Sequence, residues 1–400
     1  MQKALPFEKT QLELSSYDSE YINNALKAVG IALPKTHNRI QGRLYLTPED
    51  FIVRELHSIP CTIDKKVTKL ATPKYIHFIM VKRNISTFEA CNIFAEKNGI
   101  DYYNDINYCG LKDTLGVTAQ KICIKNIDIK QKEFDKFFIK EIGYSNKHLR
   151  IGSHIGNNFT ISVRDVMNFE ELDVSSFDEI IRKGIPNFYG LQRFGVRQNN
   201  HWLGKLLLTK KYDEFIVKFL TDTNHESKEI SELRNQMSKH NEDWNKCLEL
   251  IKDFDGFSDE KELLYNLLKM DKLEAIRKMK LSQFFVHSYA SYLFNIIMSQ
   301  FLSKNYKRVH LVKLGKNAKL DDTNKELYQE ILESEGITFD DFENCDLDVY
   351  AHFRPTLFFP KNFSCTCVDK DIVLKFDLGK GQYASMILDF IVESNDVKWC

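Results

Sequence analysis

The sequence predicts an α+β fold in which one domain is built from both ends of the chain and is interrupted by a mostly helical insertion. Several strand-like segments lie between residues 43 and 163, and more lie between 365 and 386. Residues 200–343, in contrast, are mostly helical in pattern. A length of 400 residues suits two or three domains. Hydrophobic residues make up 43% of the chain and charged residues 28%, as in ordinary globular proteins that bury a large core.

The first elements follow from local signals. Residues 8–30 are predicted as a helical segment ending at Gly30, because glycine commonly follows the last helical turn. Residues 43–56 alternate on both sides of Thr47-Pro48-Glu49-Asp50, which predicts a strand, a turn and a second strand. Tyr75–Val81 is predicted as another strand. Ser86-Thr87-Phe88-Glu89 has the Ser-x-x-Glu form of a capping box and predicts a helix that continues to Gly99.

The next elements continue the α+β pattern. Asn107–Gly110 is predicted as a short strand or turn, Val117–Ile124 and Phe159–Val163 as strands, and Phe169–Lys183 as a helix. The most apolar long stretch is Phe284–Leu302, and its internal polar residues indicate a buried helix rather than a membrane span.

Strands return near the C-terminus. Cys365–Val368 and Ile372–Phe376 are predicted as strands. Gly381–Met386 is a further candidate strand, and residues 386–393 form a helix or a strand.

The charges are balanced overall but segregated along the chain. Lys plus Arg and Asp plus Glu each number 56, which excludes a uniformly basic nucleic-acid-binding protein. The local balance is +6 over residues 61–150, +9 over 276–320, −6 over 221–275 and −10 over 321–350. Tyrosines are interleaved with the basic stretches, a mixture that suits a phosphate backbone with exposed bases. We expect the basic stretches to face a nucleic acid and the acidic ones to be solvated.

The nine cysteines are irregularly spaced, which is a poor disulfide framework and fits a reducing cytosol. Their closest pair, Cys365 and Cys367, has no recognisable set of further metal ligands, so we expect buried or inert thiols and no metal. Residues 1–15 lack the apolar stretch of a signal peptide. Walker A, Gly-x-Gly-x-x-Gly, His-Glu-x-x-His and Gly-x-Ser-x-Gly motifs are all absent, which favours carboxylate chemistry without a nucleotide cofactor.

Three loop-like stretches are candidates for chemistry. In residues 108–120, Asp113 lies in a glycine-bounded polar loop, where it is either a turn residue bonded to its own backbone or an ionised nucleophile or base beside Lys112. Residues 184–195 are rich in glycine and aromatic residues, and we interpret them as a hinge in preference to a base-stacking loop. In residues 149–159, Phe159 is either a core residue at a strand start or a stacking platform.

Four ordered motifs carry a family resemblance. They are Pro48-Glu49-Asp50-Phe51-Ile52-Val53-Arg54-Glu55, Gly110-Leu111-Lys112-Asp113 with Val117-Thr118-Ala119-Gln120, Gly156-Asn157-Asn158-Phe159, and Pro186–Gly195. Together with Arg354-Pro355 and Tyr383-Ala384-Ser385, they make residues 43–393 resemble the TruD family of tRNA pseudouridine synthases. Departures from the family pattern are Thr114 in place of Lys or Arg, the order Phe188-Tyr189, and an N-terminal extension over residues 1–35.

The resemblance implies a pseudouridine-synthase-type catalytic domain over residues 36–184 and 354–400, with an antiparallel or mixed sheet, interrupted by an inserted TRUD domain over 185–353. It implies isomerisation of uridine to pseudouridine in tRNA, typically at position 13, with no cofactor and no metal. The partner is then tRNA, and we expect a cytoplasmic monomer without membrane attachment.

By the same resemblance Asp113 is the required carboxylate, Phe159 stacks on the target base and is partly exposed, and Asn157 positions the nucleotide or the loop. Further substrate-binding residues are expected to be Lys112, Arg54, Gln120 and Arg193, and the cation that pairs with Asp113 is Lys112, Arg54 or Arg43. A non-catalytic RNA-binding or chaperone protein of the same fold is the alternative. A glycosidase would need two carboxylates about 5–9.5 Å apart, and no second carboxylate stands out near Asp113.

Overall fold

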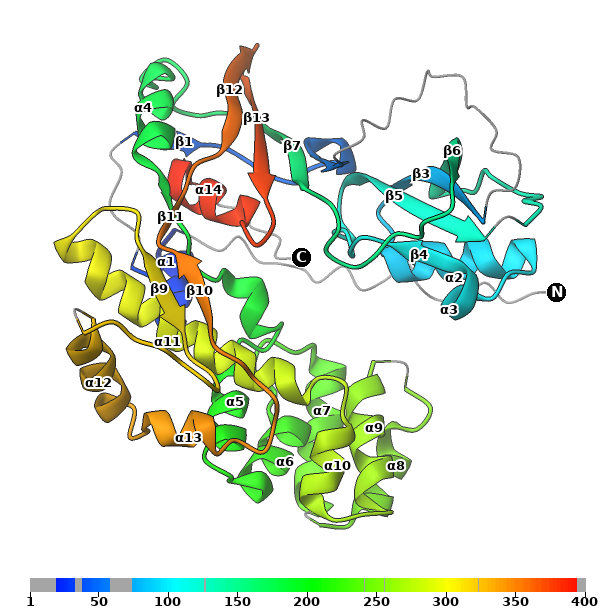
Figure 1. Cartoon of the computed structure of the whole chain (residues 1–400), viewed down its shortest axis with the longest axis vertical. Coiled ribbons are helices and arrows are strands. Elements are labelled where there is room, and N and C mark those ends of the chain that lie inside the picture. Colours follow the sequence, from blue (N-terminus) through cyan, green and yellow to red (C-terminus); the bar gives the residue numbers. More distant parts are fainter. Residues whose placement is uncertain are drawn as a thin grey trace. The chain divides into compact units, whose positions relative to one another are not determined.

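The computed structural model describes residues 19–32, 38–57, 74–125, 127–240, 242–254, 256–322 and 324–393 (Figure 1). The described chain divides into two compact units. The sheet unit contains residues 38–185 and 358–393, and the helical unit contains residues 20–32 and 186–357. The chain passes between the units at Ile185–Pro186 (β8) and at Leu357–Phe358 (β11). The predicted α+β class is confirmed.

The main sheet of the sheet unit is mixed and has eight strands. Its order is β12-β13-β7-β2-β5-β3-β6, and β4 also pairs with β5. All of its pairings are antiparallel except the parallel pairing of β2 with β5. The strands are β2 (Phe51–Leu56), β3 (Tyr75–Arg83), β4 (Ile106–Tyr108), β5 (Val117–Lys125), β6 (Phe137–Ser145), β7 (Gly156–Val163), β12 (Lys361–Val368) and β13 (Asp371–Gly379).

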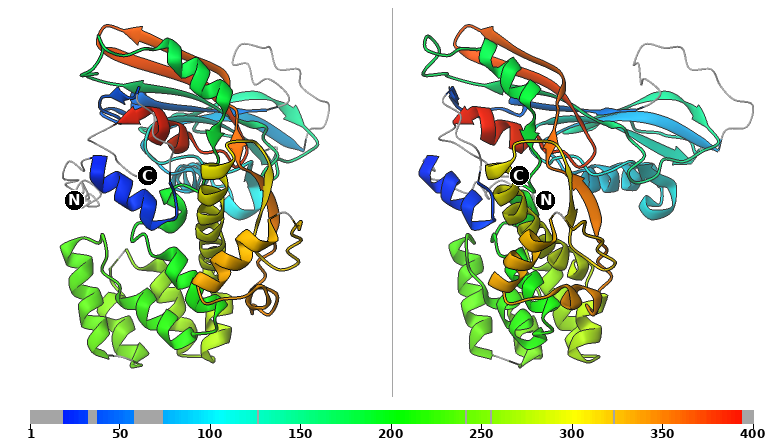
Figure 2. Two further views of the ribbon diagram at one scale, coloured as in Figure 1. Left: turned by 90° about the vertical axis from the view of Figure 1, so that its left-hand side faces the viewer. Right: turned by 60° about the vertical axis from the view of Figure 1, so that its left-hand side comes forward.

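Short elements and helices complete the sheet unit. They are β1 (Ile40–Gln41), which pairs in parallel with β14 (Val392–Glu393), the 3-10 helix η1 (Pro48–Asp50), and the helices α2 (Thr87–Asn98), α3 (Tyr102–Asp105), α4 (Ser175–Lys183) and α14 (Ala384–Ile391). A core of Phe78, Met80, Ile122 and Ile124 from the strands packs with Phe94 of α2. Figure 2 shows α2 and α14 on the same side of the sheet, near its two ends.

The helical unit is organised around one long helix. This is α11 (Ser282–Lys304), which is buried along most of its length and packs against α5 (Asn200–Leu208). The other elements are α1 (Ser19–Ala28), η2 (Leu191–Phe194), α6 (Tyr212–Thr221), α7 (Lys228–Met237), η3 (Ser238–His240), α8 (Trp244–Ile251), α9 (Ser258–Leu267), α10 (Lys272–Lys278), α12 (Lys325–Ser334), α13 (Phe339–Glu343) and the antiparallel ribbon of β9 (His310–Lys313) and β10 (His352–Pro355). Among the described residues, no helix combines the length and apolar character that crossing a membrane would require.

Most locally signalled elements are confirmed. Ser86 caps α2 by accepting a hydrogen bond of 3.0 Å from the Glu89 amide, and Gly99 ends it with φ at 65°. The predicted strand before Thr47 is wrong, because only the short β1 and an isolated bridge from Arg43 to Arg164 occur there. Gly381–Met386 is not a strand, since α14 begins at Ala384.

The other terminal and helical predictions are met in part. The predicted helix over 169–183 begins only at Ser175, and the strand β6 was not predicted. Of the N-terminal segment, residues 19–30 are described and hold α1, whereas residues 8–18 lie outside the described chain.

Candidate active site

The strand register of the sheet unit brings the predicted motifs onto one face. Residues paired across neighbouring strands project from the same face, so Lys82, Thr118, Val53, Phe159 and Phe376 form one row across five strands. Because successive side chains alternate, residues two positions along lie on the same face as this row. Residues from five segments, between positions 53 and 376 of the chain, thereby share one surface.

The neighbouring row on this face is polar at its centre, between Met80 of β3 and Leu378 of β13. It contains Gln120, which is two positions after Thr118, and the paired residues Glu55 and Asn157. Gly156 begins β7 beside Asn157, and a Cβ there would lie 2.0 Å from the carbonyl oxygen of Leu378. The glycine of the Gly-Asn-x-Phe motif is therefore required for the pairing of β7 with β13.

The loop that carries Asp113 connects β4 to β5 and is fixed by buried hydrogen bonds. Gln120 donates from Nε2 to the carbonyl of Gly110 at 3.2 Å, while its Oε1 accepts from the Thr87 hydroxyl at 2.8 Å. The same Thr87 hydroxyl accepts from the backbone amide of Lys112 at 3.1 Å. Gln120, predicted as a substrate-binding residue, is 1% exposed and has both ends of its amide engaged, so in this structure it supports the loop.

A second support for the loop comes from Lys82. Its ammonium donates to the carbonyl oxygens of Asp113 at 2.5 Å, Ile85 at 2.7 Å and Lys112 at 3.3 Å, and the residue is 1% exposed. The pKa of Lys82 is lowered to about 8, mainly by burial and also by the positive charge of Lys112, whereas the negative charge of Asp113 opposes the shift. A buried cation therefore lies against the backbone of the candidate catalytic residue.

The carboxyl of Asp113 is in a strongly desolvated position. Burial raises its pKa, and this outweighs the opposing effects of a backbone hydrogen bond and of the charges of Lys82 and Lys112. Both lysines favour the ionised form that a nucleophile or base needs.

Lys112 is itself paired with Glu55. Lys112 Nζ lies 2.6 Å from Glu55 Oε2, and His57 Nε2 lies 2.5 Å from Glu55 Oε1. Both side chains of the Lys112–Glu55 pair are at most 4% exposed. Burial alone would raise the pKa of Glu55, but its contacts with His57 and Lys112 lower it overall, so this carboxylate is held ionised.

Apart from the atoms in the ion pairs of Glu55, three buried polar atoms on or beside this face have no hydrogen-bond partner among the described residues. They are Thr118 Oγ1, Asn157 Oδ1 and His154 Nδ1. His154 lies beside the loop, because a Cβ on Gly110 would be 3.8 Å from its ring. Buried polar atoms are normally paired, so these three are suited to contact a polar ligand.

The structure therefore brings together Asp113, Lys112, Gln120, Asn157 and Phe159, all in the sheet unit. The expectation that Phe159 is partly exposed is wrong. It is 6% exposed and packs between Phe51 and Phe376, with ring centroids 6.1 and 5.4 Å away, because hydrophobic side chains flank it on both neighbouring strands.

Two of the cations proposed for Asp113 lie elsewhere. Arg54 is exposed and alternates with Val53 and Glu55, so it projects from the opposite face of the sheet. Arg43 forms an ion pair with Asp165 at 3.6 Å. The charges that act on Asp113 belong to Lys82 and Lys112.

Arg193 belongs to the helical unit. It lies in η2, with its guanidinium carbon 4.7 Å from the ring centre of Phe284 and 5.9 Å from that of Tyr189. The aromatic residues Phe188, Tyr189 and Phe194 around it are buried, so they are core residues rather than a base-stacking loop.

Sequence reasoning missed Lys82, Thr87 and the role of Glu55. The signal for Lys82 was present, because in Tyr75–Arg83 it has the same parity as the core residues Phe78 and Met80. Thr87 and Glu55 gain their roles only through contacts with distant segments.

By distance, the trio Glu55, His57 and Cys109 could hold a metal ion, since their ligand atoms lie within 4.8 Å of one another. The Lys112 ammonium already occupies the cation position beside Glu55. The seven cysteines that the structure describes are free thiols, and Cys61 and Cys400 lie outside the described residues.

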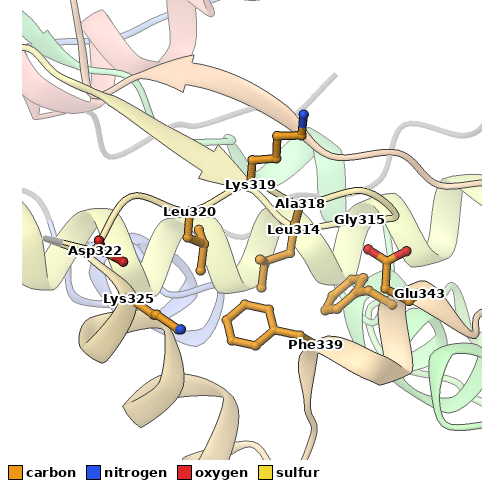
Figure 3. A pocket seen from close by; sticks show the side chains of 10 residues that line it. Leu314, Gly315, Ala318, Lys319, Leu320, Asp322, Lys325, Phe339 and Glu343 are labelled. Carbon is orange, nitrogen blue, oxygen red and sulfur yellow. The ribbon is translucent and has the colours of Figure 1, made fainter.

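A separate cavity of about 380 Å³ lies in the helical unit (Figure 3). It is lined by the segment that follows β9 in sequence and by residues of α12 and α13. Leu314, Leu320 and Phe339 line it, together with Asp322, Lys325 and other residues. None of the predicted site residues is among its lining residues.

Comparisons with known proteins agree with the motif resemblance. The family model "tRNA pseudouridine synthase D (TruD)" matches residues 29–313 and 302–390. The chain is 29% identical to "Probable tRNA pseudouridine synthase D 2" of Methanocaldococcus jannaschii over 86% of this chain and 90% of that one. It is 27% identical to "Probable tRNA pseudouridine synthase D" of Pyrococcus furiosus over 91% and 98% of the two chains.

The crystal structure of the "Putative tRNA pseudouridine synthase D (TruD)" from Methanosarcina mazei has the same fold, with a TM-score of 0.69 at 23% identity over 92% of this chain and 98% of that one. Since the family model covers most of the sequence, the chain belongs to the TruD family of tRNA pseudouridine synthases, which are isomerases.

Proposed function

We propose that this protein converts a uridine of tRNA, at position 13, to pseudouridine, with Asp113 as the catalytic carboxylate and without a cofactor. The observation that carries the proposal is the position of Asp113, which lies in the family's catalytic segment on a loop fixed by Lys82 and Gln120. The family membership and the names of the relatives support tRNA as the substrate.

The reaction breaks the N1–C1′ bond of uridine, turns the uracil, and joins its C5 to C1′. The proton on C5 is lost and N1 gains one, so the product is an isomer of the substrate and no oxidant or reductant is needed. An ionised carboxylate can attack C1′ or C6, or it can remove the C2′ proton. Each of these routes requires Asp113 to be charged, which Lys82 and Lys112 favour.

The target base must leave its stack to reach the half-buried carboxylate of Asp113, at a cost of a few kcal/mol. The unpaired atoms Thr118 Oγ1, Asn157 Oδ1 and His154 Nδ1 are suited to bind the polar edges of the extruded nucleotide and to offset part of this cost. Stacking of the base on Phe159 is not retained in the proposal, because that ring is buried between Phe51 and Phe376.

The test is tritium release from tRNA that carries 5-tritiated uridine, measured for the parent protein and for Asp113→Asn. The variant should bind tRNA within a few-fold of the parent and release no tritium. Asp105→Asn is the matched control, because Asp105 lies in the same unit but pairs with Lys125 at 2.8 Å, and it should retain turnover. Substantial turnover by Asp113→Asn would contradict the assignment, and a parent protein that binds tRNA without turnover would favour the non-catalytic alternative.

A further inference from the structure

The β9–β10 ribbon of the helical unit lies next to α11 (Figure 1). Five basic side chains gather around this ribbon. Lys313 and His352 are paired across the two strands, and Arg354 projects from the same face two residues after His352. His287 approaches from α11, with its Nδ1 2.7 Å from Lys313 Nζ. Arg193 of η2 completes this group, called here the cation cluster, and both arginines contact the ring of Tyr189.

The cation cluster is buried, yet the charges within it repel one another. Lys313 is 0% exposed and Arg354 is 8% exposed. The pKa of Lys313 is lowered to about 7, mainly by burial and also by the positive charges of Arg193 and Arg354. The pKa of His287 is lowered to about 3 by burial and by Lys313, Arg193 and His352, so His287 accepts the hydrogen bond from Lys313 as a neutral ring.

Two other buried cations of the helical unit have carboxylate partners. Arg234 pairs with Glu226 at 3.0 Å and with Glu260 at 2.8 Å, and Arg197 lies within 3.7 Å of the same two carboxylates. Buried charges are expensive unless an opposite charge lies beside them. Among the described residues, the charges that act on Lys313 are those of Arg193 and Arg354, so an anion from outside the chain would relieve an unfavourable arrangement.

Hydrogen bonding points to the same conclusion. Arg193 Nε is buried and has no partner among the described residues. Arg354 donates to the Asn187 carbonyl at 2.9 Å and to the Asn187 side chain at 2.7 Å. His352 is exposed, so the cation cluster reaches the surface.

We propose that the cation cluster binds a backbone phosphate of the substrate RNA, with Lys313 and Arg193 as the principal donors. Guanidinium and ammonium groups form strong charge-assisted hydrogen bonds with phosphate oxygens. Two of the five members of the cluster, His287 and Lys313, lie within the most basic stretch of the chain, residues 276–320, whose charge balance is +9. The choice of RNA as the source of the phosphate rests on the proposed function, whereas the need for an anion comes from the cluster itself.

The first experiment measures tRNA binding by the full chain as a function of salt, for the parent and for Lys313→Met. The variant should bind at least about tenfold more weakly at low salt, and its slope of log affinity against log salt should be smaller by about 1, because one phosphate contact is lost. Lys205→Met is the control, since Lys205 is already paired with Glu335 at 2.8 Å, and its slope should equal that of the parent. An unchanged slope and affinity in Lys313→Met would overturn the proposal.

A pH series gives a second signature. A phosphate beside Lys313 favours its charged form, so binding takes up a proton, and the affinity of the parent for tRNA should fall as pH rises above about 7. Lys313→Met should lose this dependence on Lys313. If Lys313→Met does not fold, as judged by thermal denaturation, Arg193→Gln provides the salt-slope test, because Arg193 is only partly buried.

Inorganic phosphate distinguishes the two sources of the anion. If Lys313→Met loses stabilisation by inorganic phosphate while keeping parental affinity for tRNA, the cluster serves free phosphate and the RNA contact is refuted.

Turnover separates this inference from the proposed function. A parent protein without turnover whose tRNA affinity still depends on Lys313 would refute the reaction and leave the phosphate site standing, whereas an active parent matched by Lys313→Met in KM would refute the phosphate site alone.

Discussion

Replacing Lys82 with arginine is expected to remove a loss of activity that the parent protein shows above about pH 8. The pKa of Lys82 is lowered to about 8 by burial, so the ammonium beside Asp113 becomes neutral as pH rises through that value. A neutral amine no longer offsets the charge of Asp113, and turnover should fall by up to about tenfold per pH unit beyond it. Arginine stays charged, so Lys82→Arg should remain active to about pH 10.

The lowered pKa of Lys82 also predicts how the free energy of unfolding changes with pH. The unfolded chain keeps the Lys82 proton up to 10.5, whereas the folded chain releases it near 8. Between these values the unfolded state binds more protons, so the free energy of unfolding rises with pH, by about 3 kcal/mol in total for a shift of this size. Below pH 8 both states are protonated and this contribution does not change. Lys82→Met should lack the rise.

The assays are single-turnover tritium release and denaturant unfolding between pH 6 and 10. Comparison at each pH with the same tRNA cancels effects of pH on the RNA. Lys125→Arg is the control, because Lys125 lies on the neighbouring strand β5 and is paired with Asp105 at the surface. Parallel pH–rate profiles for the parent and a folded Lys82→Arg, together with equal pH dependence of unfolding for the parent and Lys82→Met, would refute the assigned role of Lys82.

Further predictions concern the core, the buried ion pair and RNA binding. Phe159→Ala should lose about 3–5 kcal/mol of stability in denaturant unfolding, while Phe353→Ala, at 62% exposure, should lose little; equal stabilities would show that Phe159 is not a core residue. Glu55→Gln should also lose about 3–5 kcal/mol, because it leaves the Lys112 ammonium buried and unpaired, and adding Lys112→Met should restore part of the loss. tRNA affinity should weaken steeply with salt despite the zero net charge, and a flat plot of log affinity against log salt would contradict binding through the basic stretches.

The elements that the sequence predicts well are those determined by residues that lie close together in the chain. The helix α2 is bounded by Ser86 and Gly99, whose effects act within one turn of the chain. The strand β3 is a mostly apolar run and β5 alternates, and both are predicted within two residues of their observed ends. The strand β6 was missed, and α14 was assigned in part to a strand, because segments with mixed signals depend on their packing partners.

In the candidate site too, local features could be predicted from the sequence, whereas contacts between distant segments could not. Asp113 was predicted from its loop and motif, whereas its contact with Lys82 depends on how β3 pairs with β5. Alternation along β2 would have placed Arg54 on the far face of the sheet, but the sequence does not say which face carries the site. The burial of Phe159 depends on Phe376, which lies 217 positions later in the chain.

The most direct test of the central claim is to map pseudouridine in a tRNA transcript that contains no modified bases, after incubation with the purified full chain. The account predicts one new pseudouridine, at position 13, that forms without added metal or cofactor and does not form with Asp113→Asn. Pseudouridine at other positions only would contradict the assigned target. Pseudouridine formed equally by the parent and by Asp113→Asn would contradict the assignment of the reaction to this site.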